Sequence, residues 1–222
     1  MTARVCVSIL PTTVPEALRL IEKAEAAHAD FIEVRLDRLK DCLEKHRGLA
    51  DLAAHGKTPK IATDKASRTE TEQRQMLLNA AKSNFEYVDV ELSTPQLEDL
   101  VKELKALGAK PIVSFHKFDG SLSISELNSV LEREISSRAE VCKIVTTAKQ
   151  MEDNLTTLNF TSAVSSRTKV VCFCMGDFGK VSRLLSPLFG GFFTFASLER
   201  GSETASGQMT IQEMKAAYKL LG

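Results

Sequence analysis

The sequence predicts a single (β/α)8 TIM barrel, because eight short apolar segments rich in β-branched residues alternate with segments of helical periodicity. The apolar segments start roughly 22 to 31 residues apart, which is the length of a strand, a crossover helix and two short loops. A chain of 222 residues is long enough for eight such units. The predicted strands are residues 4–10, 31–37, 60–64, 87–92, 111–116, 141–147, 170–175 and 192–197.

The segments between the strands carry helix boundary signals. Residues 95–108 have helical periodicity, with Thr94 as the expected N-cap, Pro95 in the first turn and Gly108 as the C-terminal stop. The capping-box pattern occurs at residues 69–72 (T-E-T-E) and 123–126 (S-I-S-E). In this motif the hydroxyl of the first residue and the carboxylate of the fourth each accept a hydrogen bond from the other residue's backbone N–H. We therefore expect helices to begin directly after both motifs.

No feature divides the chain, so residues 1–222 are expected to form one domain. The sequence has no low-complexity tract, no linker and no change in composition. The structural alternative is a doubly wound open sheet, which often carries G-x-G-x-x-G after its first strand. Nothing of that kind follows the first predicted strand, and the barrel is favoured.

The composition favours a small-molecule substrate over a nucleic-acid or membrane partner. The 29 basic and 29 acidic side chains cancel, so global charge does not attract an anionic polymer or surface. The apolar run near the N-terminus is too short for a signal peptide, and no run reaches the roughly 20 apolar residues that a membrane helix needs. A cytoplasmic protein is expected.

Cysteine usage agrees with a reducing compartment. Four of the five cysteines, Cys6, Cys142, Cys172 and Cys174, lie within apolar runs, where a thiol usually behaves as a small hydrophobe. Cys172 and Cys174 form C-x-C without a second pair or a nearby histidine pair. No metal site is therefore expected.

Polar side chains recur on one face of five predicted strands. Successive side chains of a strand point to opposite faces, so one set packs on the helices and the other faces the barrel interior. The polar set that shares the interior face is Ser8, Glu33, Arg35, Asp37, Asp89, Glu91, Ser114, His116 and Lys143. Barrel enzymes carry their active sites at the C-terminal ends of the strands, and these groups predict such a site.

Lys143 lies in the middle of an apolar strand, on the same face as Val141 and Val145. Its simplest interpretation is a structural ion pair, for which Asp89 and Glu91 are available partners. The chemical interpretation is a nucleophile, because burial lowers the pKa of a lysine and leaves some free amine for a Schiff base. The polar neighbours favour the second interpretation.

Other side chains suit acid/base catalysis and ligand binding. His116 is either a hydrogen-bonded core histidine or a general acid/base, and its place at the end of a strand favours the latter. Arg183 follows a glycine-rich turn and suits a carboxylate, the alternative being a solvent-facing helix arginine. Glu33, Arg35 and Asp37 either form an internal ion-pair network or hold substrate hydroxyls.

The last loop, residues 198–208, is long and polar, with Gly201 and Gly207 within it. Loops that follow barrel strands surround the active site. This loop is therefore a candidate lid over the mouth of the barrel.

Together these segments resemble the type I 3-dehydroquinate dehydratase family, the Schiff-base enzymes of the shikimate pathway of aromatic amino acid biosynthesis. The resemblance covers essentially the whole chain. Its marks are E-V-R-L-D on the second predicted strand, D-V-E-L on the fourth, S-F-H on the fifth, C-K-I on the sixth, G-K-V-S-R-L after the seventh and S-G-Q in the last loop. Each mark is weak alone, but all of them in order form a specific signal.

The resemblance implies that the enzyme converts 3-dehydroquinate to 3-dehydroshikimate and water, with Lys143 forming the imine and His116 acting as acid/base. It implies that Glu33 and Arg35 hold ring hydroxyls and that Arg183 binds the carboxylate. The further residues that it implies to line or close the pocket are Ser8, Met175, Phe195, Thr204, Ala205 and Gln208. The family is metal-free, needs no cofactor beyond the covalent lysine–substrate imine, and is usually a homodimer.

The third predicted strand departs from the family pattern. Asp64 stands where members usually place an arginine, and the loop after it lacks the Glu-Gly-Gly stretch that many members have. Lys65 and Arg68 are the candidates for a replacement cation. No site residue is assigned to this strand.

Two other functions stay open at this point. The first is a class I aldolase-like Schiff-base lyase, although Gly190 and Gly191 lie at the wrong end of the eighth predicted strand to supply its phosphate site. The second is a non-catalytic barrel that binds a polyhydroxy acid.

Overall fold

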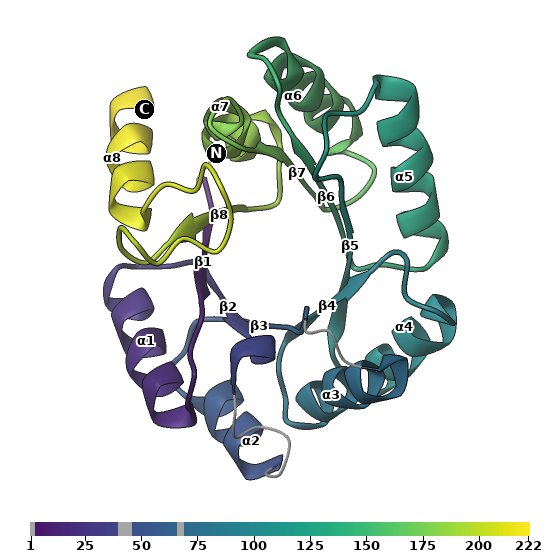
Figure 1. The fold of residues 1–222 in the computed structure, drawn as a ribbon, viewed down its shortest axis with the longest axis vertical. Helices are drawn as coiled ribbons and strands as arrows, with labels where there is room; N and C mark the ends of the chain where they lie inside the picture. The colour runs from purple at the N-terminus through teal and green to yellow at the C-terminus, as the bar shows by residue number, and fades with distance from the viewer. Residues whose placement is uncertain (1–2, 40–45, 66–68) are drawn as a thin grey trace.

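The structure, a computed structural model, describes residues 3–39, 46–65 and 69–222. Over these residues eight strands form one parallel sheet in the order β7-β6-β5-β4-β3-β2-β1-β8, and the sheet curls into a nearly closed ring inside a ring of helices (Figure 1). The strands are β1 (Val5–Ile9), β2 (Phe31–Arg35), β3 (Lys60–Thr63), β4 (Tyr87–Glu91), β5 (Lys110–His116), β6 (Val141–Thr147), β7 (Val170–Met175) and β8 (Thr194–Ser197). The predicted (β/α)8 barrel is confirmed.

A helix follows each strand and packs on the outside of the sheet (Figure 1). The helices are α1 (Val14–Ala26), α2 (His46–Ala54), α3 (Glu70–Lys82), α4 (Leu97–Ala106), α5 (Ile124–Ser136), α6 (Glu152–Val164), α7 (Lys180–Leu185) and α8 (Ile211–Leu221), with short 3-10 helices η1 (Leu36–Arg38) and η2 (Ser186–Phe189). The capping boxes at Thr69 and Ser123 are confirmed, and Thr210 forms a third. In the described part of the chain, no helix has the length and apolarity to cross a bilayer.

Helix α4 begins later than predicted. Thr94 is not its N-cap, because the Thr94 N–H donates to the Glu91 carbonyl at 3.0 Å in a turn after β4. Gln96 then takes a left-handed conformation with φ of 51°, and the helix starts at Leu97. This turn redirects the chain from the end of the strand to the outside of the barrel. The helix ends as predicted, with Gly108 at φ of 87° directly after its C-cap.

The interior of the barrel is apolar at one end and polar at the other. On each of the strands β2 to β6 an apolar inward residue precedes the polar ones, as Phe31 precedes Glu33 and Val141 precedes Lys143. The inward apolar cluster contains Cys6, Phe31, Ile61, Tyr87, Ile112, Val141, Val145, Val171, Phe173, Met175, Phe193 and Phe195. The N-terminal end of the barrel is thus filled, and the polar groups face the opposite end.

The seam of the barrel lies between β7 and β8. These strands form no ladder, and the Phe192 N–H donates to the Val170 carbonyl at 2.7 Å across the seam. The last strand therefore starts at Thr194, two residues after its predicted start. Phe193, just before it, packs against Phe31 in the apolar end of the barrel, with ring centroids 4.7 Å apart.

Candidate active site

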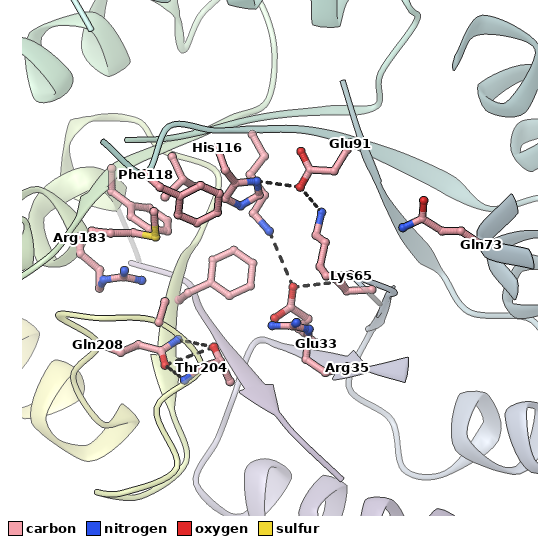
Figure 2. Close-up of a pocket in the computed structure, with 17 residues that line it drawn as sticks. Glu33, Arg35, Lys65, Gln73, Glu91, His116, Phe118, Arg183, Thr204 and Gln208 are labelled. Carbon is pink, nitrogen blue, oxygen red and sulfur yellow. Dashed lines mark hydrogen bonds and ion pairs between the residues drawn. The ribbon is translucent and has the colours of Figure 1, made fainter. Parts of the chain in front are cut away.

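A cavity of about 470 Å³ opens at the C-terminal ends of the strands, as expected for a barrel enzyme (Figure 2). The predicted site residues that line it are Glu33, Arg35, His116, Lys143, Met175, Arg183, Phe195, Thr204, Ala205 and Gln208. Ser8, predicted to line the pocket, does not: it is buried, and its hydroxyl donates a hydrogen bond to Glu33. Ser8 therefore supports a cavity residue instead of forming the wall.

Lys143 is a buried cation paired with carboxylates. Its side chain is 6% exposed, its Nζ donates to Asp89 Oδ2 at 2.8 Å, and Glu33 Oε1 lies 3.7 Å away. Nζ also lies 4.4 Å from the centroid of the Phe195 ring. Burial alone disfavours the ammonium, but the carboxylates of Asp89 and Glu33 outweigh it, so the pKa of Lys143 lies above its usual value. The expected net lowering of this pKa is wrong, because the alternation of β2 and β4 brings two acids to the same nitrogen.

Asp89 is a fully buried carboxylate shared by two lysines. Its Oδ2 accepts from Lys143, while its Oδ1 accepts from Lys65 Nζ at 2.7 Å and from Ser114 Oγ at 2.7 Å. Burial raises the pKa of a carboxyl, but the two ammonium groups more than offset it and hold the pKa of Asp89 far below its usual value. Asp89 is therefore an anion throughout the neutral pH range.

His116 ends β5 and lies beside Glu91 at the mouth (Figure 2). Its Nδ1 is 2.9 Å from Glu91 Oε1, an ion-pair distance at which the ring N–H is not aligned for a hydrogen bond. Phe118 stacks on the imidazole, with ring centroids 6.0 Å apart and planes 12° from parallel. The ring is thus oriented by a carboxylate on one side and an aromatic face on another.

Glu33 and Arg35 are fixed by different partners. Arg35 forms a bidentate pair with Asp37, with Nε to Oδ1 at 2.8 Å and one terminal nitrogen to Oδ2 at 2.9 Å. Glu33 accepts from Thr63 Oγ1 at 2.9 Å and from Ser8. Both side chains are therefore oriented by the protein while they face the cavity.

Arg183, on α7, is a buried cation that contacts no carboxylate of the described residues. Its exposed fraction is 1%, and its guanidinium lies 4.3 Å from the centroid of the Phe173 ring. One terminal nitrogen makes a long contact of 3.5 Å to the Ser206 carbonyl, and Nε has no partner among these residues. Burial lowers the pKa of Arg183 to about 10, so it is charged at neutral pH. A buried guanidinium on a cavity wall without a counter-ion is suited to bind an anionic ligand.

The loop before α8 lines part of the cavity with Thr204, Ala205 and Gln208. Its Thr204 and Gln208 are joined by a 2.7 Å hydrogen bond from the Thr204 N–H to Gln208 Oε1 (Figure 2). The Gly176 N–H donates to the Ser206 carbonyl at 3.2 Å. Gly207 has φ of 75°, and a β-carbon there would collide with the Gly176 backbone. The candidate lid therefore packs directly on the turn after β7.

Strand β3 and the residues after it contribute side chains to the cavity, although no site residue was predicted there. Thr63 and Lys65 line the cavity, whereas Asp64 is 2% exposed and is absent from the lining. Lys65 thus supplies a cation at this end of β3, one residue after the position where the family pattern has its arginine. Arg68, the other candidate, lies outside the described residues. Alternation carried on from Thr63 would have placed residue 65 inside. The sequence named Lys65 as a candidate cation but did not assign it to the site, because the predicted strand stopped at residue 64.

No group of three or more metal-binding side chains occurs within residues 3–39, 46–65 and 69–222. A barrel with a buried amine, an imidazole and an unpaired guanidinium around one cavity belongs to the class of (β/α)8 enzymes that act on small anionic molecules.

Comparison with known proteins identifies the family. A sequence model of type I 3-dehydroquinase matches residues 5–222. A 3-dehydroquinate dehydratase of Dehalococcoides mccartyi is 36% identical over 215 residues, which cover 94% of this chain and 92% of that protein. One of Methanococcus maripaludis is 31% identical over 227 residues, covering 98% and 100%. The crystal structure of the Geobacillus kaustophilus 3-dehydroquinate dehydratase has the same fold, with a TM-score of 0.89 at 23% identity over 100% of this chain and 91% of that one. The chain belongs to the type I 3-dehydroquinase family.

Proposed function

We propose that Lys143 carries out the family's reaction by forming an imine with the C3 ketone of 3-dehydroquinate. The chain is a 3-dehydroquinate dehydratase, a hydro-lyase of the shikimate pathway that produces 3-dehydroshikimate and water. The observation that carries the proposal is the position of the Lys143 amine, buried on the wall of the cavity that also holds His116 and Arg183. Family membership disfavours the aldolase-like and non-catalytic alternatives.

The two carboxylates beside Lys143 suit an iminium as well as an ammonium. When Nζ bonds to C3, the ketone oxygen leaves as water and a cationic iminium replaces the ammonium. The charge next to Asp89 and Glu33 is the same before and after this step. Asp89, at 2.8 Å, therefore stabilises the intermediate as it stabilises the lysine. The same two carboxylates raise the pKa of Lys143.

His116 serves as the acid/base in the elimination. The iminium withdraws electrons from C2, and His116 removes the C2 proton to give an enamine. His116 then returns a proton to the C1 hydroxyl, which leaves as water and creates the C1–C2 double bond. Hydrolysis of the iminium consumes the water that imine formation released, and frees Lys143 and 3-dehydroshikimate. Glu91, at 2.9 Å, keeps the ring in position.

Substrate recognition is assigned to groups on opposite sides of the amine. Arg183 binds the substrate carboxylate and becomes paired on binding. Glu33 and Arg35 bind the ring hydroxyls, with Ser8 acting through Glu33. The remaining wall and the closing loop are formed by Met175, Phe195, Thr204, Ala205 and Gln208.

We also infer that the enzyme works as a cytoplasmic homodimer, without a metal or cofactor and without nucleic acid. The iminium itself supplies the electron sink that a cofactor provides elsewhere. Met151, Leu155 and Phe178 are 49%, 62% and 49% exposed, and Asn154 Nδ2 bonds the Phe178 carbonyl, so these apolar side chains gather around the start of α6 and suit a second copy. A monomeric mass in solution would contradict the dimer.

Borohydride trapping tests the imine. The enzyme is incubated with 3-dehydroquinate and borohydride, and the adduct is located by intact mass and peptide mapping. We expect one adduct on Lys143, its loss together with activity in Lys143→Ala, and its retention in Lys102→Ala on the outer face of α4. Turnover without an adduct, or full activity of Lys143→Ala, would refute the Schiff-base route.

A further inference from the structure

Lys65 connects the two carboxylates that hold the catalytic pair. Its Nζ is 2.7 Å from Asp89 Oδ1 and 2.5 Å from Glu91 Oε1. The other oxygen of Asp89 binds Lys143, and the same oxygen of Glu91 contacts His116. Figure 2 shows Lys65 reaching toward Glu91 on the side opposite His116. Among the residues that the structure describes, Lys65 is the cation that contacts both carboxylates.

The fold places Lys65 there through the register of β3 and β4. Thr63 pairs with Asp89, so residue 65 lies two positions further along the same inner face, level with Glu91. The Lys65 side chain is 23% exposed, compared with 0% for Asp89. Asp89 already accepts from Lys143 and Ser114. Lys65 therefore adds a second positive charge to a carboxylate whose hydrogen bonds are otherwise satisfied.

We propose that Lys65 is a positioning residue that balances the charge of Asp89 and Glu91 and thereby sets the pH range in which Lys143 and His116 react. The proposal rests on the Schiff-base role of Lys143 and extends it. Lys65 need not touch the reacting atoms for this role. It acts through the two carboxylates, of which Asp89 stabilises the Lys143 ammonium and Glu91 contacts the His116 ring.

The sign of the effect follows from the charges. Lys65 offsets part of the negative charge on Asp89 and repels the Lys143 ammonium, and both effects favour loss of the Lys143 proton. Without Lys65, the ammonium faces Glu33, Asp89 and Glu91 alone and is held more strongly. Attack on the ketone needs a neutral amine, and proton abstraction needs a neutral imidazole. Loss of Lys65 should therefore move the acidic limb of the activity profile to higher pH.

Other charges around the pair stay constant in this comparison. The remaining titratable and charged groups that face Lys143 and His116 are Cys6 from β1, Glu33 and Arg35 from β2 with Asp37 paired to Arg35, Asp89 and Glu91 from β4, Arg183 from α7, and Glu134 of α5 on the outer side of the sheet. A substitution at residue 65 leaves each of these side chains in place, and among them Asp89 and Glu91 lose a direct contact.

The test compares kcat/KM across roughly pH 5 to 10 for Lys65→Met, Lys65→Arg and Lys102→Met. Lys65→Met removes the charge and keeps an unbranched chain of similar length, whereas Lys65→Arg keeps the charge. Lys102→Met removes the same charge from the exposed side of α4, away from the cavity. We expect the acidic limb of Lys65→Met to move up by about one pH unit, the size expected for one unit charge in a partly exposed site. The profiles of the other two variants should keep the wild-type midpoint.

Two results would overturn the proposal. The first is a Lys65→Met profile that coincides with the wild-type profile, and the second is a Lys65→Arg profile that moves as far as that of Lys65→Met. Lys65→Gln repeats the measurement if Lys65→Met does not fold, as judged by circular dichroism. Borohydride trapping of the wild type is run in parallel. A missing Lys143 adduct there refutes the Schiff-base role, whereas a trapped adduct with unshifted profiles refutes only the role of Lys65.

Discussion

Replacing Arg183 with methionine should stabilise the enzyme and weaken substrate binding at the same time. Arg183 is 1% exposed and contacts no carboxylate of the described residues. Burial lowers the pKa of Arg183 from its ordinary value to about 10. At about 1.4 kcal/mol per pH unit, the guanidinium is buried at a cost of about 3 kcal/mol. Methionine keeps an apolar contact with Phe173 and has no charge to bury, so Arg183→Met should unfold with a free energy roughly 1 to 3 kcal/mol higher than the wild type.

The same substitution removes the cation that we propose for the substrate carboxylate. Loss of a charge-assisted, bidentate pair in a buried site costs roughly 2 to 4 kcal/mol. This corresponds to a rise in KM of roughly 30-fold to 1000-fold. Stability and binding should therefore change in opposite directions.

Urea unfolding without substrate and initial rates over a range of 3-dehydroquinate concentrations measure the two effects. Arg183→Lys keeps the charge, so it should bind substrate better than Arg183→Met and should not gain its stability. Arg35→Met is the matched contrast, because it leaves Asp37 unpaired with its side chain 9% exposed and should destabilise the fold. The reasoning is refuted if Arg183→Met loses as much stability as Arg35→Met and keeps the wild-type KM.

Two further predictions concern His116 and a buried acid on the other side of the sheet. His116→Ala should keep a trappable imine while kcat falls by roughly 10²-fold to 10⁴-fold, and normal turnover would contradict its acid/base role. Glu134, on α5, is 0% exposed, and neither of its carboxylate oxygens has a partner among the described residues. Burial, and then the charges of Asp89 and Glu91, raise the pKa of Glu134 well above 4.5, so the folded state keeps a proton that the unfolded state releases. Stability is therefore lost as pH rises from that value toward the folded pKa, by up to about 1.4 kcal/mol per pH unit, and Glu134→Gln removes this loss. In urea unfolding, the free energy of unfolding of Glu134→Gln relative to that of the wild type should be higher at about pH 8 than at about pH 5. An equal difference at both pH values would refute this explanation.

The fold and the inner face could be predicted because both depend on local periodicity. Alternation alone separates Glu33 and Lys143 from the helix-facing Val34 and Ile144, and the structure agrees at each of these positions. The start of α4 could not be read in this way. Gln96 adopts a left-handed conformation that glutamine rarely takes and that the sequence therefore does not predict, and the helix starts after it.

The pairing of charges could not be predicted because it depends on the register between strands. The sequence shows that Lys143, Asp89 and Glu91 face inward, but not which carboxylate reaches the amine or that Lys65 shares it. Burial alone therefore predicted the wrong direction for the pKa of Lys143. Ser8 shows the same limit, since its inward position was predicted but its contact with Glu33 removes it from the wall.

In the described part of the chain, apolar packing around Phe31 and Phe193 fills the N-terminal end of the barrel, so the cavity opens at the C-terminal end. Substrate and product must then use the same opening, and the segment carrying Thr204 and Gln208 forms part of the cavity wall. Any change in the packing of that segment that favours substrate binding therefore also slows product release through the same opening. Turnover is therefore fastest when neither substrate binding nor product release is slowed too far. A channel open at both ends would not have this constraint.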